Sequence, residues 1–251
     1  MITEADTILD VTLRPAVNFG ERDAVLPVDI LLLHYTGMKS SEAAIDWLCV
    51  EESGVSCHYV VNESGAITQL VSEKMRAWHA GMSSWQGQTD INSRSIGIEI
   101  VNPGHEHGYP AFPKQQIEAV CALSKDIVTR HDIPARNVLA HSDVAPARKR
   151  DPGEKFPWRT LAEAGVGLWL PEDANTDPIM CQGENSESVA GIKSWLVAYG
   201  YDLEINGEFD EELALVVRAF QRHFRPSTVS GVLDIGTCNT IESLLKIVAE
   251  V

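Results

Sequence analysis

The sequence has few basic residues, no closely paired cysteines and no long hydrophobic run. Its 20 Lys and Arg stand against 36 Asp and Glu, which gives a formal net charge of −16 at pH 7. Because a phosphate backbone is bound mainly by Lys and Arg, this balance argues against general nucleic-acid binding. No stretch approaches the run of about 18 apolar residues that marks a membrane-spanning helix. We therefore expect no nucleic-acid partner and no membrane-spanning segment.

The cysteines and the N-terminal segment bear on the cellular compartment. The five cysteines are widely spaced and include no CxxC pair, which indicates free thiols rather than a metal knuckle or a disulfide framework. Free thiols favour a reducing compartment. The first residues, MITEADTILDVTLRPAV, lack the basic and apolar regions of a signal peptide. The sequence therefore predicts a cytoplasmic location.

Short apolar runs alternate with helical patterns in the first part of the chain. The 44% content of hydrophobic residues supports a core of real size. Period-two patterns and turn residues predict strands, whereas apolar residues three and four apart predict helices. The predicted elements are a strand at 29–34, a helix at 40–52, a hairpin at 58–71 that turns at 63–65, a strand at 95–101, a helix at 114–130 and a strand at 137–141. This order predicts an α/β fold, with a mixed central β-sheet flanked by helices.

The composition changes after residue 170, where Pro, Asp, Asn and Gly become frequent. Such a segment is typical of a linker. Three short helical patterns follow, and two of them begin at similar tetrads, GEFD at 207–210 and GVLD at 231–234, in which Asp can cap the helix. We therefore predict a catalytic domain at residues 1–170, a linker at 171–186 and a small C-terminal three-helix domain at 187–251.

Three residues have the chemistry of a catalytic metal site. His34 and His141 each end a predicted strand, and Asp151 follows His141 in the segment HSDVAPARKRDPG. A catalytic zinc takes three protein ligands and leaves one position open, which two imidazoles and a carboxylate satisfy. A single histidine at a strand end is more often structural, so the hypothesis depends on the combination.

Two further charged residues are candidates for a role beside that metal. Lys149 lies two positions before Asp151, and in an extended chain both side chains point the same way. Its ammonium could stabilise an oxyanion, although the run from 148 to 150 also fits an ordinary solvated basic surface. Glu99, within the predicted strand SIGIEIV, points away from the neighbouring isoleucines, towards either solvent or a cleft. In a cleft it could serve as a general base.

Five segments in this order carry a resemblance to a known family. ILLLHYTG, SCHYVVNESGAITQLV, RAWHAG, SIGIEIVN and HSDVAPARKRDPG together resemble the zinc-dependent N-acetylmuramoyl-L-alanine amidases of the AmpD and AmiD type, over about residues 31–156. The resemblance implies one zinc ion held by His34, His141 and Asp151. It also implies Glu99 as the general base and Lys149 as a stabiliser of the transition state.

The same resemblance extends to substrate contacts and to the C-terminal region. RAWHAG lines the cleft in this family, which makes Arg76 and His79 candidates for binding the stem peptide or the sugar. The guanidinium of Arg76 suits a carboxylate, because it can bind one through two hydrogen bonds. The segment LALVVRAFQRHFRP and its flanking tetrads resemble the three-helix peptidoglycan-binding domain of AmiD-type amidases.

The implied reaction is hydrolysis of the amide between N-acetylmuramic acid, or its anhydro form, and L-alanine, in peptidoglycan or muropeptides. Two alternatives remain open: a non-catalytic peptidoglycan-recognition protein, and a zinc endopeptidase acting on the stem peptide. Recognition proteins of this fold usually lack a zinc ligand, whereas all three candidates are present here, which favours an enzyme. A wall-binding domain also leaves a periplasmic or wall-associated location, reached by a non-classical route, as the alternative compartment.

Overall fold

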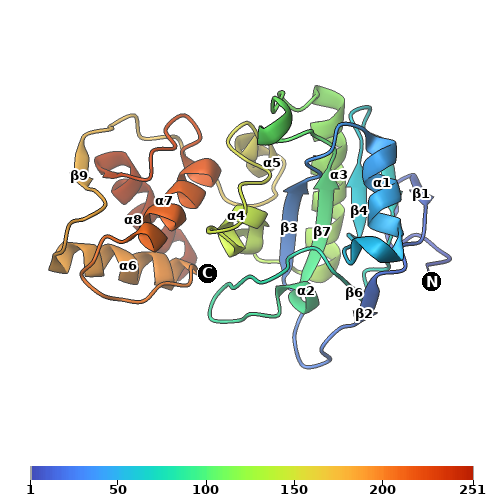
Figure 1. Cartoon of the computed structure of the whole chain (residues 1–251), viewed down its shortest axis with the longest axis horizontal. Helices are drawn as coiled ribbons and strands as arrows, with labels where there is room; N and C mark the ends of the chain where they lie inside the picture. The colour runs from blue at the N-terminus through green and yellow to red at the C-terminus, as the bar shows by residue number, and fades with distance from the viewer. Residues whose placement is uncertain (1, 251) are drawn as a thin grey trace.

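The protein consists of an α/β part and a helical part (Figure 1). The computed structural model describes residues 2–250. The strands of the α/β part are β1 (Val11–Leu13), β2 (Phe19–Glu21), β3 (Ile30–Tyr35), β4 (Tyr59–Val61), β5 (Ile67–Gln69), β6 (Met75–Ala77), β7 (Ser95–Ile100) and β8 (Val138–Ala140). Its α-helices are α1 (Ser41–Cys49), α2 (Ile91–Arg94), α3 (Lys114–His131), α4 (His141–Val144) and α5 (Trp158–Glu163). The helical part contains β9 (Pro178–Met180), α6 (Glu187–Tyr199), α7 (Glu211–Phe224), β10 (Leu233–Asp234) and α8 (Ile235–Ala249).

The central sheet has six strands in the order β1-β5-β4-β7-β3-β8. Strands β4 and β5 form the predicted antiparallel hairpin, whereas β3 runs parallel to both β7 and β8. Helix α3 covers one face of the sheet, and α1 lies on the other (Figure 1). The prediction of a mixed sheet with flanking helices is therefore confirmed. The sequence patterns missed the short edge strand β1 and the small β2–β6 ladder.

The two faces of the sheet have different roles. Ile96, Ile98 and Ile100 pack against α3, because alternate residues of a strand point to the same face. The intervening residues of β7 point to the opposite face, where Glu99 is the register partner of His34 on β3. The alternation in the sequence thus places these two polar side chains next to each other, away from the α3 core.

The helical part contains the three predicted helices. Asp210 caps α7 by accepting a hydrogen bond from the Leu213 backbone at 2.8 Å, and Asp234 caps α8 by accepting one from Thr237 at 2.7 Å. Both caps come from the repeated tetrads, and they satisfy backbone N–H groups that a helix leaves free. The predicted linker is not wholly irregular, since β9 within it pairs antiparallel with β10.

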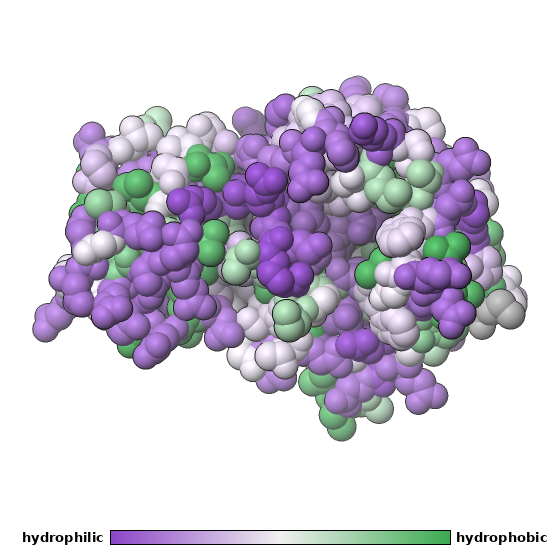
Figure 2. Space-filling model, viewed as in Figure 1, coloured by the Kyte–Doolittle hydropathy of each residue, from purple (hydrophilic) through white to green (hydrophobic). Residues whose placement is uncertain are grey.

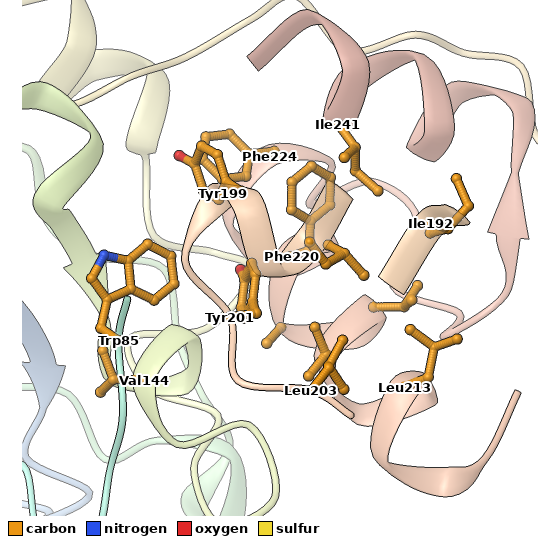
Figure 3. Close-up of a cluster of buried hydrophobic side chains, with 14 of the residues drawn as sticks. Trp85, Val144, Ile192, Tyr199, Tyr201, Leu203, Leu213, Phe220, Phe224 and Ile241 are labelled. Atoms are coloured by element: carbon orange, nitrogen blue, oxygen red, sulfur yellow. The ribbon is translucent and has the colours of Figure 1, made fainter. Parts of the chain in front are cut away.

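One hydrophobic cluster joins the two parts (Figure 3). Trp85 and Val144 of the α/β part pack against Tyr199 and Tyr201 of the helical part, and the cluster continues into α7 and α8. The domain boundaries predicted at residues 170 and 186 stay predictions. Within residues 2–250, no helix combines the length and the apolar character needed to cross a bilayer.

Candidate metal centre and active site

Three predicted ligands converge on one point. His34 Nδ1 lies 2.9 Å from His141 Nδ1 and 3.3 Å from Asp151 Oδ2, and His141 Nδ1 lies 3.0 Å from the same carboxylate oxygen. All three side chains are buried. This geometry could hold a single metal ion, because three ligand atoms around one ion lie about 3.3 Å apart when each bond is about 2.0–2.1 Å.

Local structure explains why residues far apart in sequence meet here. His34 lies near the end of β3, beside β8, and His141 follows β8 directly. The sequence predicted that His141 ends a strand, whereas it is the first residue of α4. The Ser142 backbone N–H donates to the Asp151 carbonyl at 3.1 Å, which ties the two ligand-bearing segments together.

The hydrogen bonds of the imidazoles fix which nitrogen is free. His141 Nε2 lies 3.1 Å from the Ala80 carbonyl, which can only accept, so the proton is on Nε2. For His34 the chain of bonds is longer, running from Nε2 to His79 Nδ1 at 3.0 Å and from His79 Nε2 to the Ser95 hydroxyl at 3.3 Å. Ser95 donates to a carbonyl at 2.6 Å. His79 therefore donates to Ser95 and accepts from His34.

These bonds test whether the residues fit a metal. Both Nδ1 atoms carry lone pairs, and they face each other and a carboxylate oxygen at the distances above. Burial lowers the pKa of His34 to about 4, an effect that the His141 imidazole increases and Asp151 opposes. Burial raises the pKa of Asp151, but His141 and His34 outweigh it and hold the pKa well below its usual range. Three electron-rich atoms that meet in one buried place repel one another unless a cation lies between them. Two imidazoles with one carboxylate are a ligand set that suits a transition metal such as zinc.

The approach of His79 to the sheet requires a glycine. A Cβ atom at Gly97 would lie 2.6 Å from His79 Nδ1, closer than real Cβ atoms come. Glycine in a strand often marks such a close approach of another group. His79 is buried, and it lines the cavity while contacting His34. Its predicted role in substrate binding stays a prediction, and the observed contact is with a metal-ligand candidate.

Glu99 opens onto the same cavity as two of the ligand candidates, His141 and Asp151. Its Oε2 atom is enclosed and makes no hydrogen bond with the described residues. Burial raises the pKa of Glu99 to about 8, the Asp151 charge adds to that rise, and the Lys149 ammonium opposes it. An enclosed carboxylate without a partner is costly, which is typical of a functional group rather than a structural one.

Lys149 lines the cavity together with Asp151, as their spacing predicted. The cavity has a volume of about 420 Å³, and Arg148 and Arg150 also border it. A protein with a net charge of −16 thus presents three successive cations beside its metal-ligand candidates. Strongly hydrophilic residues cover the middle of this face, over the region where α4, β3 and β7 lie (Figure 2). Such a border suits a substrate that carries carboxylates.

Arg76 lies elsewhere. Its guanidinium binds the Asp90 carboxylate through Nε at 3.1 Å and NH2 at 2.9 Å, and the residue is not part of the cavity lining. Asp90 also caps α2 by accepting from the Ser93 backbone. The two-bond recognition of a carboxylate expected for Arg76 is thus made within the protein. Its role as a substrate contact stays a prediction that no contact in this cavity supports.

The structure adds cavity residues that the sequence did not single out. Trp47, on α1, is 48% exposed and borders the cavity. His105 also borders the cavity, held by the Tyr35 hydroxyl at 2.9 Å and stacked on Tyr109. The exposed side of an amphipathic helix could have indicated Trp47, whereas no local signal marked His105.

Two imidazoles and a carboxylate that converge at the edge of a mixed sheet, beside an unpaired glutamate, define the class of metal-dependent hydrolases. The comparison with protein families is more specific. Residues 24–154 match the N-acetylmuramoyl-L-alanine amidase family model, and residues 185–241 match a peptidoglycan binding domain. The chain belongs to the N-acetylmuramoyl-L-alanine amidase family.

Relatives of known sequence and structure agree with this assignment. The N-acetylmuramoyl-L-alanine amidase AmiD of Escherichia coli is 38% identical over 236 residues, which cover 87% of this chain and 83% of AmiD. The structure of Escherichia coli AmiD with anhydro-N-acetylmuramic acid-L-Ala-D-gamma-Glu-L-Lys superposes with a TM-score of 0.77 at 34% identity, covering 91% of this chain and 97% of that one. AmpDh3 of Pseudomonas aeruginosa gives a TM-score of 0.74 at 33% identity and 98% coverage of both chains. The predicted family and the prediction of an amidase are confirmed.

Proposed function

We propose that the chain is a zinc-dependent hydrolase that cleaves the amide between N-acetylmuramic acid, or anhydro-N-acetylmuramic acid, and L-alanine in peptidoglycan or muropeptides. The observation that carries the proposal is the meeting of His34 Nδ1, His141 Nδ1 and Asp151 Oδ2 within 3.3 Å, beside a cavity that Glu99 and Lys149 line. The named substrate of the AmiD structure, an anhydromuramoyl peptide, supports this choice of bond.

The metal site would be formed by His34, His141 and Asp151. A bound zinc ion supplies Lewis acidity, which polarises a carbonyl and lowers the pKa of water. The protein holds the two imidazoles in the orientation they need, because His79 and the Ala80 carbonyl accept the Nε2 protons. Outer partners of this kind keep the other nitrogen available for the metal.

Glu99 transfers protons, and Lys149 stabilises negative charge. The Glu99 carboxylate takes a proton from the attacking water and delivers one to the leaving nitrogen of L-alanine as the C–N bond breaks. A nearby cation favours the carboxylate form, so a metal ion held by His34, His141 and Asp151 would lower the pKa of Glu99 and leave its carboxylate free to act as a base. The Lys149 ammonium stabilises the negative charge that develops on the former carbonyl oxygen. The products are a muramic carboxylate and a peptide with a free L-alanine amine.

The test is to incubate the purified protein with anhydro-muropeptides and, separately, with intact sacculi, each with and without a chelator. Mass spectrometry should detect free peptides that begin with L-alanine, and their formation should stop in chelator and return with added zinc. Cleavage between stem-peptide residues would instead identify a zinc endopeptidase. Unchanged substrate in the presence of zinc would identify a recognition protein and overturn the proposal.

The compartment is a separate question. A cytoplasmic location, predicted from the thiols and the N-terminal segment, goes with recycled anhydro-muropeptides as substrates, whereas a location at the wall goes with sacculi. Fractionation of cells that produce the chain, followed by immunoblotting, would decide between them.

A further inference from the structure

A single carboxylate connects the metal-ligand helix to the helical part of the molecule. Asp143, in the first turn of α4, is 2% exposed. Its Oδ2 atom accepts from the Ala140 backbone N–H at 2.8 Å and lies 2.7 Å from His223 Nδ1. Its Oδ1 atom accepts from the Tyr201 hydroxyl at 2.8 Å. Two of these three partners, Tyr201 and His223, belong to the helical part.

The hydrogen bonds of Asp143 fix the backbone next to the metal-ligand candidate His141. Ala140 directly precedes His141, so the carboxylate holds the backbone at the start of α4. The next residue, Ser142, donates to the Asp151 carbonyl. The backbone that supports two of the three ligand candidates is thus anchored through Asp143. A shift of this short helix would move His141 Nδ1 relative to Asp151.

The two donors from the helical part are held in place by packing. The ring of His223 stacks on Trp158 with a centroid distance of 3.7 Å and an angle of 22°. The ring of Tyr201 packs edge-on against Trp85 at 5.2 Å. Gly200, at φ 147°, lets the chain pass Trp85, since a Cβ there would lie 2.5 Å from the indole. Trp85 and Tyr201 belong to the shared cluster (Figure 3).

We propose that the helical part is a positioning element of the metal centre, in which Tyr201 and His223 orient His141 through Asp143. This role is separate from any binding of peptidoglycan by the same helices. It rests on the metal site of the proposed function. Groups that support metal ligands from outside typically contribute about 10- to 100-fold to metal affinity.

The deciding experiment measures zinc affinity in the full chain, by competition with a chromogenic chelator. Tyr201→Phe keeps the packed ring and removes only the hydroxyl, and we expect zinc affinity to fall about tenfold. The matched control is Tyr199→Phe, because Tyr199 lies in the same cluster but its hydroxyl makes no hydrogen bond to Asp143. The control should bind zinc within twofold of wild type.

A second pair of variants tests the other donor. His223→Leu removes the N–H that faces Asp143, whereas His223→Asn retains an N–H donor near the position of Nδ1. We expect about tenfold weaker zinc binding in His223→Leu and recovery in His223→Asn. The absorption spectrum of the cobalt-substituted protein should change in Tyr201→Phe and His223→Leu, because it reports ligand geometry directly.

Thermal unfolding of the metal-free variants separates positioning from general stabilisation. A Tyr201→Phe protein that melts earlier but binds zinc and cobalt like wild type would overturn the inference. If His223→Leu does not fold, the Tyr201→Phe comparison still decides the matter. Failure of the wild-type chain to bind zinc would refute the proposed function instead, so the two failures are distinguishable.

Discussion

Two charged side chains, Lys193 of the helical part and Glu99 of the α/β part, differ in their hydrogen-bond partners. In the helical part, Lys193 is 0% exposed, and its Nζ lies 2.8 Å from Asn206 Oδ1 and 2.9 Å from Asp210 Oδ2. In the α/β part, Glu99 Oε2 is enclosed without a partner, and no other carboxylate oxygen among residues 2–250 is in that position. A buried charge with hydrogen-bond partners is typical of a structural role. A buried charge without partners at a cavity is typical of a group that binds a ligand or takes part in a reaction.

The largest expected effect is on kcat and comes from replacing the unpaired Glu99. Glu99→Gln should lower kcat about a thousandfold, because it removes the proposed general base and keeps the shape of the side chain. Zinc content, measured by atomic absorption, should stay at the wild-type level. Glu73→Gln is the matched control, since Glu73 is also buried but is paired with Arg130 and His131. It should lower stability and keep kcat within threefold, and a collapse of kcat in this control would remove the contrast.

Replacing Lys149 and Lys193 each by Met compares a lysine at the cavity with a buried, paired one. Lys149→Met should lower kcat about a hundredfold by removing charge stabilisation at the oxyanion. Lys193→Met should leave kcat unchanged and lower the free energy of unfolding by about 1–3 kcal/mol, because Asp210 loses its buried partner. Urea unfolding and steady-state kinetics on one anhydro-muropeptide measure both quantities. Equal losses of activity in the two variants would contradict the assignment of Lys149.

The raised pKa of Glu99 predicts a pH effect in the metal-free protein. The unfolded carboxyl titrates near 4.5 and the folded one at about 8. Between these values the folded state keeps a proton that the unfolded state has released, so stability falls as the pH rises from about 4.5 to about 8. Glu99→Gln removes this loss. Glu99 opens onto the cavity, where solvent screens part of the effect. We therefore expect the free energy of unfolding of the variant to rise by about 2 kcal/mol relative to wild type between pH 4.5 and pH 8.5.

Denaturant unfolding in chelator at those two pH values checks the prediction. The quantity of interest is the difference between variant and wild type, because other titrating groups contribute equally to both. A difference that does not change with pH would show that the Glu99 carboxyl has an ordinary pKa.

The smallest expected effect concerns two exposed tryptophans. Trp47 borders the cavity, whereas Trp195 on α6 is 37% exposed and lies outside the cavity lining. Trp47→Ala should raise KM about fivefold, in line with an aromatic contact of about 1 kcal/mol, and should change kcat little. Trp195→Ala should leave both constants unchanged on a short muropeptide. Equal KM values in all three proteins would show that Trp47 does not contact this substrate.

Much of the candidate metal centre could be predicted from the sequence, because its residues lie at strand ends or in a specific sequence segment. His34 follows a short apolar run, and Asp151 belongs to a specific segment after His141. The alternation in SIGIEIV placed Glu99 opposite the isoleucines, and the parallel register of β3 and β7 then brings it beside His34. These features are local or follow from regular strand geometry.

The contacts around the centre could not be predicted in the same way. The bonds of Asp143 to Tyr201 and His223 span 58 and 80 residues, and nothing next to any of the three marks its partner. Arg76 had the right chemistry for a carboxylate, but whether it meets a ligand or Asp90 depends on how the chain folds around it. Side-chain direction and long-range pairing are set by tertiary packing, which local patterns do not contain.

The aromatic contacts of Trp85 with Tyr199 and Tyr201 also decide how freely the chain can be recombined. Cutting between residues 171 and 186 to attach a different C-terminal domain would leave the indole of Trp85 and the side chain of Val144 exposed to water. Newly bared apolar surface of this kind promotes self-association. An engineered chimaera would therefore need polar substitutions at Trp85 and Val144. An enzyme whose domains are joined only by a flexible linker could exchange a domain without such substitutions.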